Sequence, residues 1–218
     1  TAADALTTGA CNIAIGINAY GGAQAGQLNI AIGDTAMGGS AVTGANNIAL
    51  GLVAMDALLA GNSNIAIGGA NTLGQLTDGD YNIGIGDRAL GGAATTGDNN
   101  IAIGCYTADA IIAGACNIAL GRDALGAATI ANYSIAIGDG AMGGVTVGAA
   151  NDNIAIGRYA LLGVAATTGD YNIGIGVQAS DGLTTGSANI ALGLNAYGAG
   201  TTGGCNVAIG KAAMGGVT

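Results

Sequence analysis

The stretch Asn100-Ile101-Ala102-Ile103-Gly104 decides the fold, because near-copies of it recur along the whole chain of 218 residues. The copies begin at Asn12, Asn29, Asn47, Asn64, Asn82, Asn100, Asn117, Ser134, Asn153, Asn172, Asn189 and Asn206, at spacings of 17 to 19 residues. Residues 1–11 match the tail of one more repeat, so the array fills the chain from end to end. We therefore expect a single domain over residues 1–218, built from repeats of one kind.

Apolar and small or polar residues alternate within each copy, which is typical of a β-strand with two different faces. A short strand and a turn that recur every 17 to 19 residues predict one coil of a solenoid, with equivalent strands stacked in parallel. The predicted fold is therefore all-β, a parallel β-solenoid (a β-roll or β-helix) of about twelve coils. At one strand spacing of about 4.8 Å per coil, the rod would be roughly 55 Å long.

The two Ile columns of the motif are expected to point into the solenoid. A column of bulky residues four positions after the motif glycine holds all four Met of the chain, and Met fills irregular gaps in cores well. The expected core therefore includes Ile13, Ile15, Ile30, Ile32, Ile101, Ile103, Met37 and Met142. In the opposite orientation the central Ala or Gly column faces inward, and some two dozen Ile, Leu and Val residues form an apolar outer face.

Two further columns are expected to have structural roles. The Asn column would form an amide ladder, in which each side chain hydrogen-bonds its neighbours in the coils above and below. Its first members are Asn12, Asn29, Asn47, Asn64, Asn82 and Asn100. The glycine that closes the motif suits a corner that requires positive φ or a close approach of coils, as at Gly16, Gly33, Gly51 and Gly68.

The composition argues against several classes of function. The net charge is −9, only 8% of residues are charged, and His and Glu are absent. An acidic chain is a poor ligand for nucleic acid or for an anionic membrane surface, and no stretch is apolar and long enough to insert into a bilayer. Without His, the usual base of nucleophilic catalysis is missing, so we expect no enzymatic activity, no catalytic residue and no cofactor.

Aspartates in turns, such as Asp78 and Asp80, are expected to cap backbone N–H groups of their own turn. The alternative, Ca²⁺ bound between the turns of adjacent coils, would need about six oxygen ligands. We therefore predict no metal site.

The chain contains four cysteines. Cys11, Cys116 and Cys205 share the column before the Asn column, and coils stacked about 4.8 Å apart separate them too far for disulfides within the chain. Free thiols that serve as small apolar residues are one interpretation. The other is a contact or bond between Cys11 of one subunit and Cys205 of the next in a head-to-tail stack.

The repeated Asn-Ile-Ala-Ile-Gly-x-x-Ala pattern resembles the Ser/Asn-Val-Ala-Ile-Gly-x-x-Ala repeats in the head domains of trimeric autotransporter adhesins and in related phage tail-fibre segments. The resemblance covers the whole chain. It implies β-rolls that trimerise, act outside the cell and have no catalytic activity. Those heads have about 14 residues per coil, fewer than this chain has, and no stalk, neck or anchor is recognisable here.

Three functional hypotheses follow. The first is a non-enzymatic structural subunit of an extracellular fibre, whose partners are other copies of itself that bind through flat, charge-poor faces and open solenoid ends. The second is a trimeric adhesin or tail-fibre head that binds a host or cell surface, so either role places the protein outside the cell or on a virion. The third is ice binding by rows of Thr such as Thr43 and Thr96, although Ala and Val interrupt this column.

Overall fold

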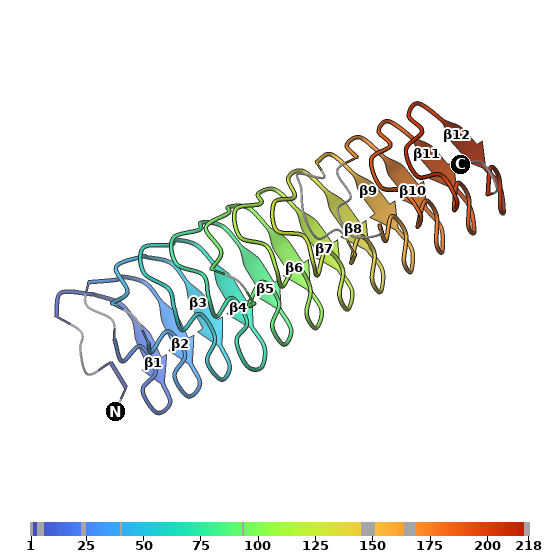
Figure 1. The fold of residues 1–218 in the computed structure, drawn as a ribbon. Coiled ribbons are helices and arrows are strands. Elements are labelled where there is room, and N and C mark those ends of the chain that lie inside the picture. The colour runs from blue at the N-terminus through green and yellow to red at the C-terminus, as the bar shows by residue number, and fades with distance from the viewer. Residues whose placement is uncertain are drawn as a thin grey trace.

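The protein is a rod of stacked coils with one long parallel sheet. The computed structural model describes residues 2–3, 7–22, 25–39, 41–92, 94–144, 151–163 and 169–215. Figure 1 shows the strands following one another along the rod in chain order. They are β1 (Ile13–Ile15), β2 (Ile30–Ile32), β3 (Ile48–Leu50), β4 (Ile65–Ile67), β5 (Ile83–Ile85), β6 (Ile101–Ile103), β7 (Ile118–Leu120), β8 (Ile135–Ile137), β9 (Ile154–Ile156), β10 (Ile173–Ile175), β11 (Ile190–Leu192) and β12 (Val207–Ile209). The predicted all-β parallel solenoid is confirmed.

Neighbouring coils are joined in register, in the strands and in the turns. Ala102 of β6 lies beside Ala119 of β7, and every other pair of consecutive strands is aligned in the same way. Outside the strands, the Tyr20 N–H donates to the Ala36 carbonyl at 2.8 Å, and the Cys116 N–H donates to the Asp98 carbonyl at 3.0 Å. Because these bonds recur from coil to coil, the same motif residues form straight columns along the rod.

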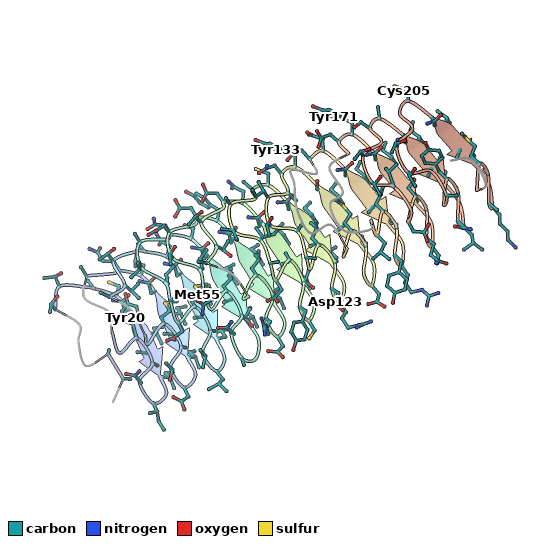
Figure 2. The ribbon with its side chains drawn as sticks, in the orientation of Figure 1. Tyr20, Met55, Asp123, Tyr133, Tyr171 and Cys205 are labelled. Carbon is teal, nitrogen blue, oxygen red and sulfur yellow. The ribbon has the colours of Figure 1, made fainter. Side chains whose placement is uncertain are left out.

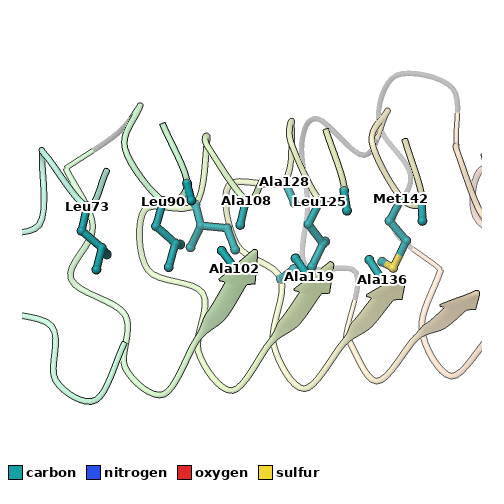
Figure 3. Packing of buried hydrophobic residues seen from close by; sticks show 14 of the residues in the cluster. Leu73, Leu90, Ala102, Ala108, Ala119, Leu125, Ala128, Ala136 and Met142 are labelled. Atoms are coloured by element: carbon teal, nitrogen blue, oxygen red, sulfur yellow. The ribbon is translucent and has the colours of Figure 1, made fainter. Parts of the chain in front are cut away.

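The interior is filled from two sides by small and bulky columns. The middle residue of each strand points inward, and Ala102, Ala119 and Ala136 are completely buried. The column of bulky residues faces them from the opposite wall, and Figure 3 shows Leu90, Leu125 and Met142 pointing toward these alanines. Met37 and Met142 are buried, as the sequence predicts.

The prediction that the Ile columns form the core is wrong. Ile13, Ile15, Ile32 and Ile103 are exposed, and Ile30 and Ile101 lie half-buried on the same outward side of the sheet. The cause is the narrow cross-section of the coil. A Cβ built on Gly84 in the inward column would already lie 3.0 Å from Cγ of Leu73, so a longer side chain has no room there. Small residues therefore occupy the inside, and the larger Ile side chains remain outside.

Large and small residues compensate one another within three of the coils. Where the bulky column holds Ala108 or Ser180, the buried residue three positions later is Ile111 or Leu183. Where the column holds Tyr197, the residue three positions later is Gly200, whose added Cβ would lie 2.4 Å from the Tyr197 ring. In these coils a change of size at one position is offset at the other, as close packing favours.

Left-handed backbone conformations recur in three columns of the coils. They are the column before Asn, the second residue after the motif glycine and the bulky column, and most of their members are not glycine. In the coil that follows Gly68 the last two are shifted by one residue, to Asn71 and Leu73. Tyr20, Met37 and Leu90, for example, have φ of 55°, 49° and 53°. Such a conformation costs a non-glycine residue about 1 kcal/mol or more, and it persists only where the surroundings fix it. Here the hydrogen bonds between coils supply that constraint.

The motif glycines have the roles predicted for them. Gly16, Gly33 and Gly51 have φ of 132°, 139° and 137°, and a Cβ on any of them would collide with the glycine carbonyl of the next coil. Gly68 lies outside that φ range, but its added Cβ would lie 2.7 Å from Oγ1 of Thr72 and 2.8 Å from the Gly86 carbonyl oxygen. Close approach alone therefore requires glycine at this fourth position.

The amide ladder is present from Asn12 onward. Oδ1 of Asn29 accepts hydrogen bonds from the Asn47 backbone N–H at 2.8 Å and from its Nδ2 at 3.1 Å. Nδ2 of Asn47 also donates to the Gly61 carbonyl at 2.8 Å. The same pattern places Asn12, Asn29, Asn47, Asn64, Asn82 and Asn100 in one hydrogen-bonded row. At Ser134 the row continues through the hydroxyl, which accepts from the Asn153 N–H at 3.3 Å.

Candidate interaction surface

The outward side of the sheet is a continuous apolar strip, which we call the Ile face. It consists of the first and third residues of β1 to β12, all of them Ile except Leu50, Leu120, Leu192 and Val207. Eleven steps of about 4.8 Å make the strip about 53 Å long, and two rows about 7 Å apart with their side chains make it roughly 12 Å wide. Its area of roughly 600 Å² is at the upper end of the apolar patches that soluble monomers expose.

Two different edges border the Ile face. The acidic edge consists of the two residues that precede the Asn column in each coil, and it contains Asp80, Asp98, Asp152 and Asp170 but no Lys or Arg. The mixed edge consists of the two residues that follow the motif glycine. It contains every Lys and Arg of the chain, namely Arg88, Arg122, Arg158 and Lys211, together with Asp34, Asp87, Asp123 and Asp139. Figure 2 shows Tyr133, Tyr171 and Cys205 along the margin of the acidic edge, and Asp123 along the opposite margin.

The carboxylates of the acidic edge cap backbone groups of neighbouring coils rather than of their own turn. Oδ1 of Asp80 accepts from the Asn62 N–H at 2.6 Å, and Oδ1 of Asp98 accepts from the Asp80 N–H at 2.8 Å. Oδ1 of Asp170 accepts from the Asn151 N–H at 2.7 Å. In the described part of the chain, no group of three or more His, Cys, Asp or Glu side chains is suited to hold a metal ion.

Three arginines on the mixed edge have different partners. Arg88 forms an ion pair with Asp109 at 3.2 Å and lies over the Tyr106 ring, 5.2 Å from its centre. Arg122 forms ion pairs with Asp123 and Asp139, and the hydrogen bond that its guanidinium donates to Asp139 raises its pKa. Arg158 lies 5.7 Å from the centre of the Tyr159 ring, and no carboxylate of the described residues is within ion-pair distance of it.

One carboxylate beside the interior lacks a full set of partners. Burial raises the pKa of Asp56, although a hydrogen bond from the Gly39 backbone opposes this effect. Its Oδ1 is buried and has no hydrogen-bond partner in the described structure. Asp109, the corresponding residue three coils further along, has Arg88 as its counter-ion.

The cysteines are free thiols in this single chain. Cys11 and Cys205 are exposed, and both occupy the acidic edge in a left-handed conformation. Their contact between stacked subunits stays a prediction.

Sequence reasoning missed the exposed tyrosines of the acidic edge. Tyr81, Tyr133 and Tyr171 are each at least 60% exposed. They stand in the column that contains Cys11 and Cys205, and aligning the repeats was the signal that could have revealed them.

The comparisons with known proteins add no family. No family model, curated protein or solved structure matches the chain. The described residues form no helix, and hence none that could cross a membrane.

Proposed function

We propose that this protein is a non-enzymatic structural subunit of an extracellular fibre, and that its copies associate through the Ile face. The single observation that carries the proposal is the unbroken Ile face. No strand among β1 to β12 places a polar or charged side chain on it. An apolar strip of this size in water favours association with another apolar surface.

The rest of the rod supports a structural role. Hydrogen bonds between coils occur in the strands, the turns and the amide ladder, so the rod is stiff without disulfides. The area of the Ile face, roughly 600 Å² per copy, is close to the roughly 800 Å² that each partner buries in a standard stable interface. A stiff rod with one exposed apolar face is suited to side-by-side assembly.

The test is sedimentation velocity of the full chain over a range of concentrations, combined with electron microscopy. We expect species larger than a monomer, and we expect the double variant Ile103→Thr/Ile156→Thr to shift them toward monomer. The matched control is Ile112→Thr, because Ile112 is 45% exposed but lies outside the strands. A wild-type chain that remains a monodisperse monomer at high concentration would overturn the proposal.

A head domain that binds a host surface is the second candidate. The repeat resembles those of trimeric adhesin heads and tail fibres, and the exposed Tyr81, Tyr133 and Tyr171 would be available for contacts at a foreign surface. This role requires a closed oligomer of fixed mass. Binding to cells that is lost in the triple Tyr→Ser variant, with the oligomer intact, would favour it over the fibre.

A further inference from the structure

The partner that best fits the Ile face is a second copy of the chain. The Ile rows repeat at one strand spacing, about 4.8 Å, over about 53 Å. A complementary surface must present apolar side chains with the same period over the same length, so that each coil of the Ile face meets an apolar row of the partner. A second Ile face meets both requirements, whereas an anionic membrane would be repelled by a chain of net charge −9.

The two edges determine how the two rods are oriented. A two-fold axis parallel to the rods exchanges the two ends of each strand, so the acidic edge of one copy meets the mixed edge of the other. A two-fold axis along the strands makes the rods antiparallel and brings the two acidic edges together. Like charges across an interface suppress that arrangement.

Individual residues match this parallel arrangement. Asp152 stands three residues before Ala155, the middle of β9, and Arg158 stands three residues after it. Asp80 and Arg88 stand four residues before and after Gly84, the middle of β5. An axis over the centre of the Ile face therefore places Asp152 opposite Arg158, and Asp80 opposite Arg88, at the same height in the partner.

We propose that two copies pack Ile face to Ile face with their rods parallel and level, and that Asp152 and Arg158 form reciprocal ion pairs across the two margins. Packed sheets lie about 10 Å apart, a gap that an extended Arg and an Asp side chain together span. Arg158 gives the clearer test of an ion pair between copies, because Arg88 already has Asp109 as a partner within its own chain. This inference rests on the proposed self-association and adds its partner and orientation.

A charge-reversal cycle tests the ion pairs. Asp152→Arg and Arg158→Glu should each weaken the dimer about tenfold, because each change introduces two like-charge contacts per dimer. The double variant should recover to within about threefold of wild type. Gln75→Glu adds a charge at an exposed site outside the strands and both edges, and it should leave the dimer unchanged.

Cross-linking tests the orientation independently. In a chain whose native cysteines are replaced by Ser, Tyr171→Cys and Val177→Cys lie three residues on either side of Gly174 in β10. A bifunctional maleimide that spans about 10 Å should join them between copies of the double variant. Tyr171→Cys alone should give no dimer, because the same residue of the partner lies on the opposite margin.

The outcomes separate this inference from the proposed function. A wild-type monomer would overturn both. An assembly that depends on the Ile face but has a trimeric mass, no recovery in the charge cycle, or no cross-link between positions 171 and 177 would overturn only the parallel two-fold pairing.

Discussion

Ala102 and Ile103 are neighbours in one strand, but their side chains lie on opposite faces of the sheet. Ala102 is completely buried, whereas Ile103 is 39% exposed. Hydrophobicity alone would place the Ile inside, because its burial removes more apolar surface from water. The interior of this coil, however, has room for little more than a methyl group at that position. Available volume therefore decides which side faces in, and the excess hydrophobicity is left on the surface.

The glycine that follows each strand lies against the next coil, and its loss should have the largest effect. Gly104 has φ of 138°, and an added Cβ would lie 2.6 Å from both the Gly121 carbonyl oxygen and Oγ1 of Thr107. We expect Gly104→Ala to destabilise the fold by about 4 kcal/mol, from backbone strain and steric overlap together. Thermal unfolding followed by circular dichroism measures it.

Gly210 provides the control for that change. It has φ of 117°, but no atom lies within 4 Å of its added Cβ. Gly210→Ala should therefore destabilise the chain by only about 1–3 kcal/mol, from strain alone. Equal effects at the two glycines would show that the contact between coils is unimportant.

Exchanging sizes across the strand tests the volume argument directly. Ala102→Leu should cost about 3 kcal/mol, because the added atoms overpack the interior, and should lower Tm by roughly 5–10 °C. Ile103→Ala should cost about 1 kcal/mol or less, since it removes only contacts on the outer face. Both are measured at dilutions where the chain is monomeric. If Ile103→Ala destabilised the chain more than Ala102→Leu, the Ile columns would have to lie in the interior.

The sequence alone predicts the coil number, the strands, the Asn row and the bulky column, because each is a matter of period. It does not predict which side of the strand faces in. Alternation of Ile13, Ala14 and Ile15 is the same in both orientations, and the choice depends on the coil's cross-section, which the left-handed turns set. Nothing in the sequence indicates that Tyr20 or Met37 adopts positive φ, since such residues rarely do.

The candidate surface could be predicted only as one of two alternatives, for the same reason. The proposed pairing of Asp152 with Arg158 depends on the centre of the Ile face, which the sequence alone does not locate. Net charge and composition reveal the excess of acid, but not that every Lys and Arg lies on one margin of the Ile face.

The polar start of the strand should be as sensitive as its apolar middle. Asn82→Ala removes the acceptor of the Asn100 N–H at 2.9 Å and the donor to the Gly97 carbonyl at 2.9 Å, all of it buried. We expect a loss of about 2 kcal/mol. Chemical denaturation measures it, with Gln75→Ala as control, because the Gln75 side chain is exposed and its backbone is not left-handed. A loss no larger than that of Gln75→Ala would mean that the ladder adds no stability.

The smallest expected effect concerns pH. The pKa of Asp56 is raised in the folded chain by burial, so its ionised form destabilises the fold above that pKa. The contribution of this residue to stability should therefore improve as pH falls through the raised folded pKa toward the usual value of 3.8. Asp56→Asn should raise Tm by about 1–2 °C at pH 7, with a smaller gain near pH 4. An equal gain at both pH values would exclude ionisation as the cause.

The amide ladder makes the junctions between coils chemically alike except at Ser134, which has a consequence for how such a chain changes in evolution. Removing residues 83–100 would join Asn82 directly to Ile101, and the new junction would contain the same Asn, Ile and Gly contacts as the old ones. Unequal recombination between repeats would thus shorten or lengthen the rod by whole steps of about 4.8 Å without creating a foreign joint. Length is therefore a trait that such a lineage is free to vary in discrete increments, independently of the chemistry along its sides.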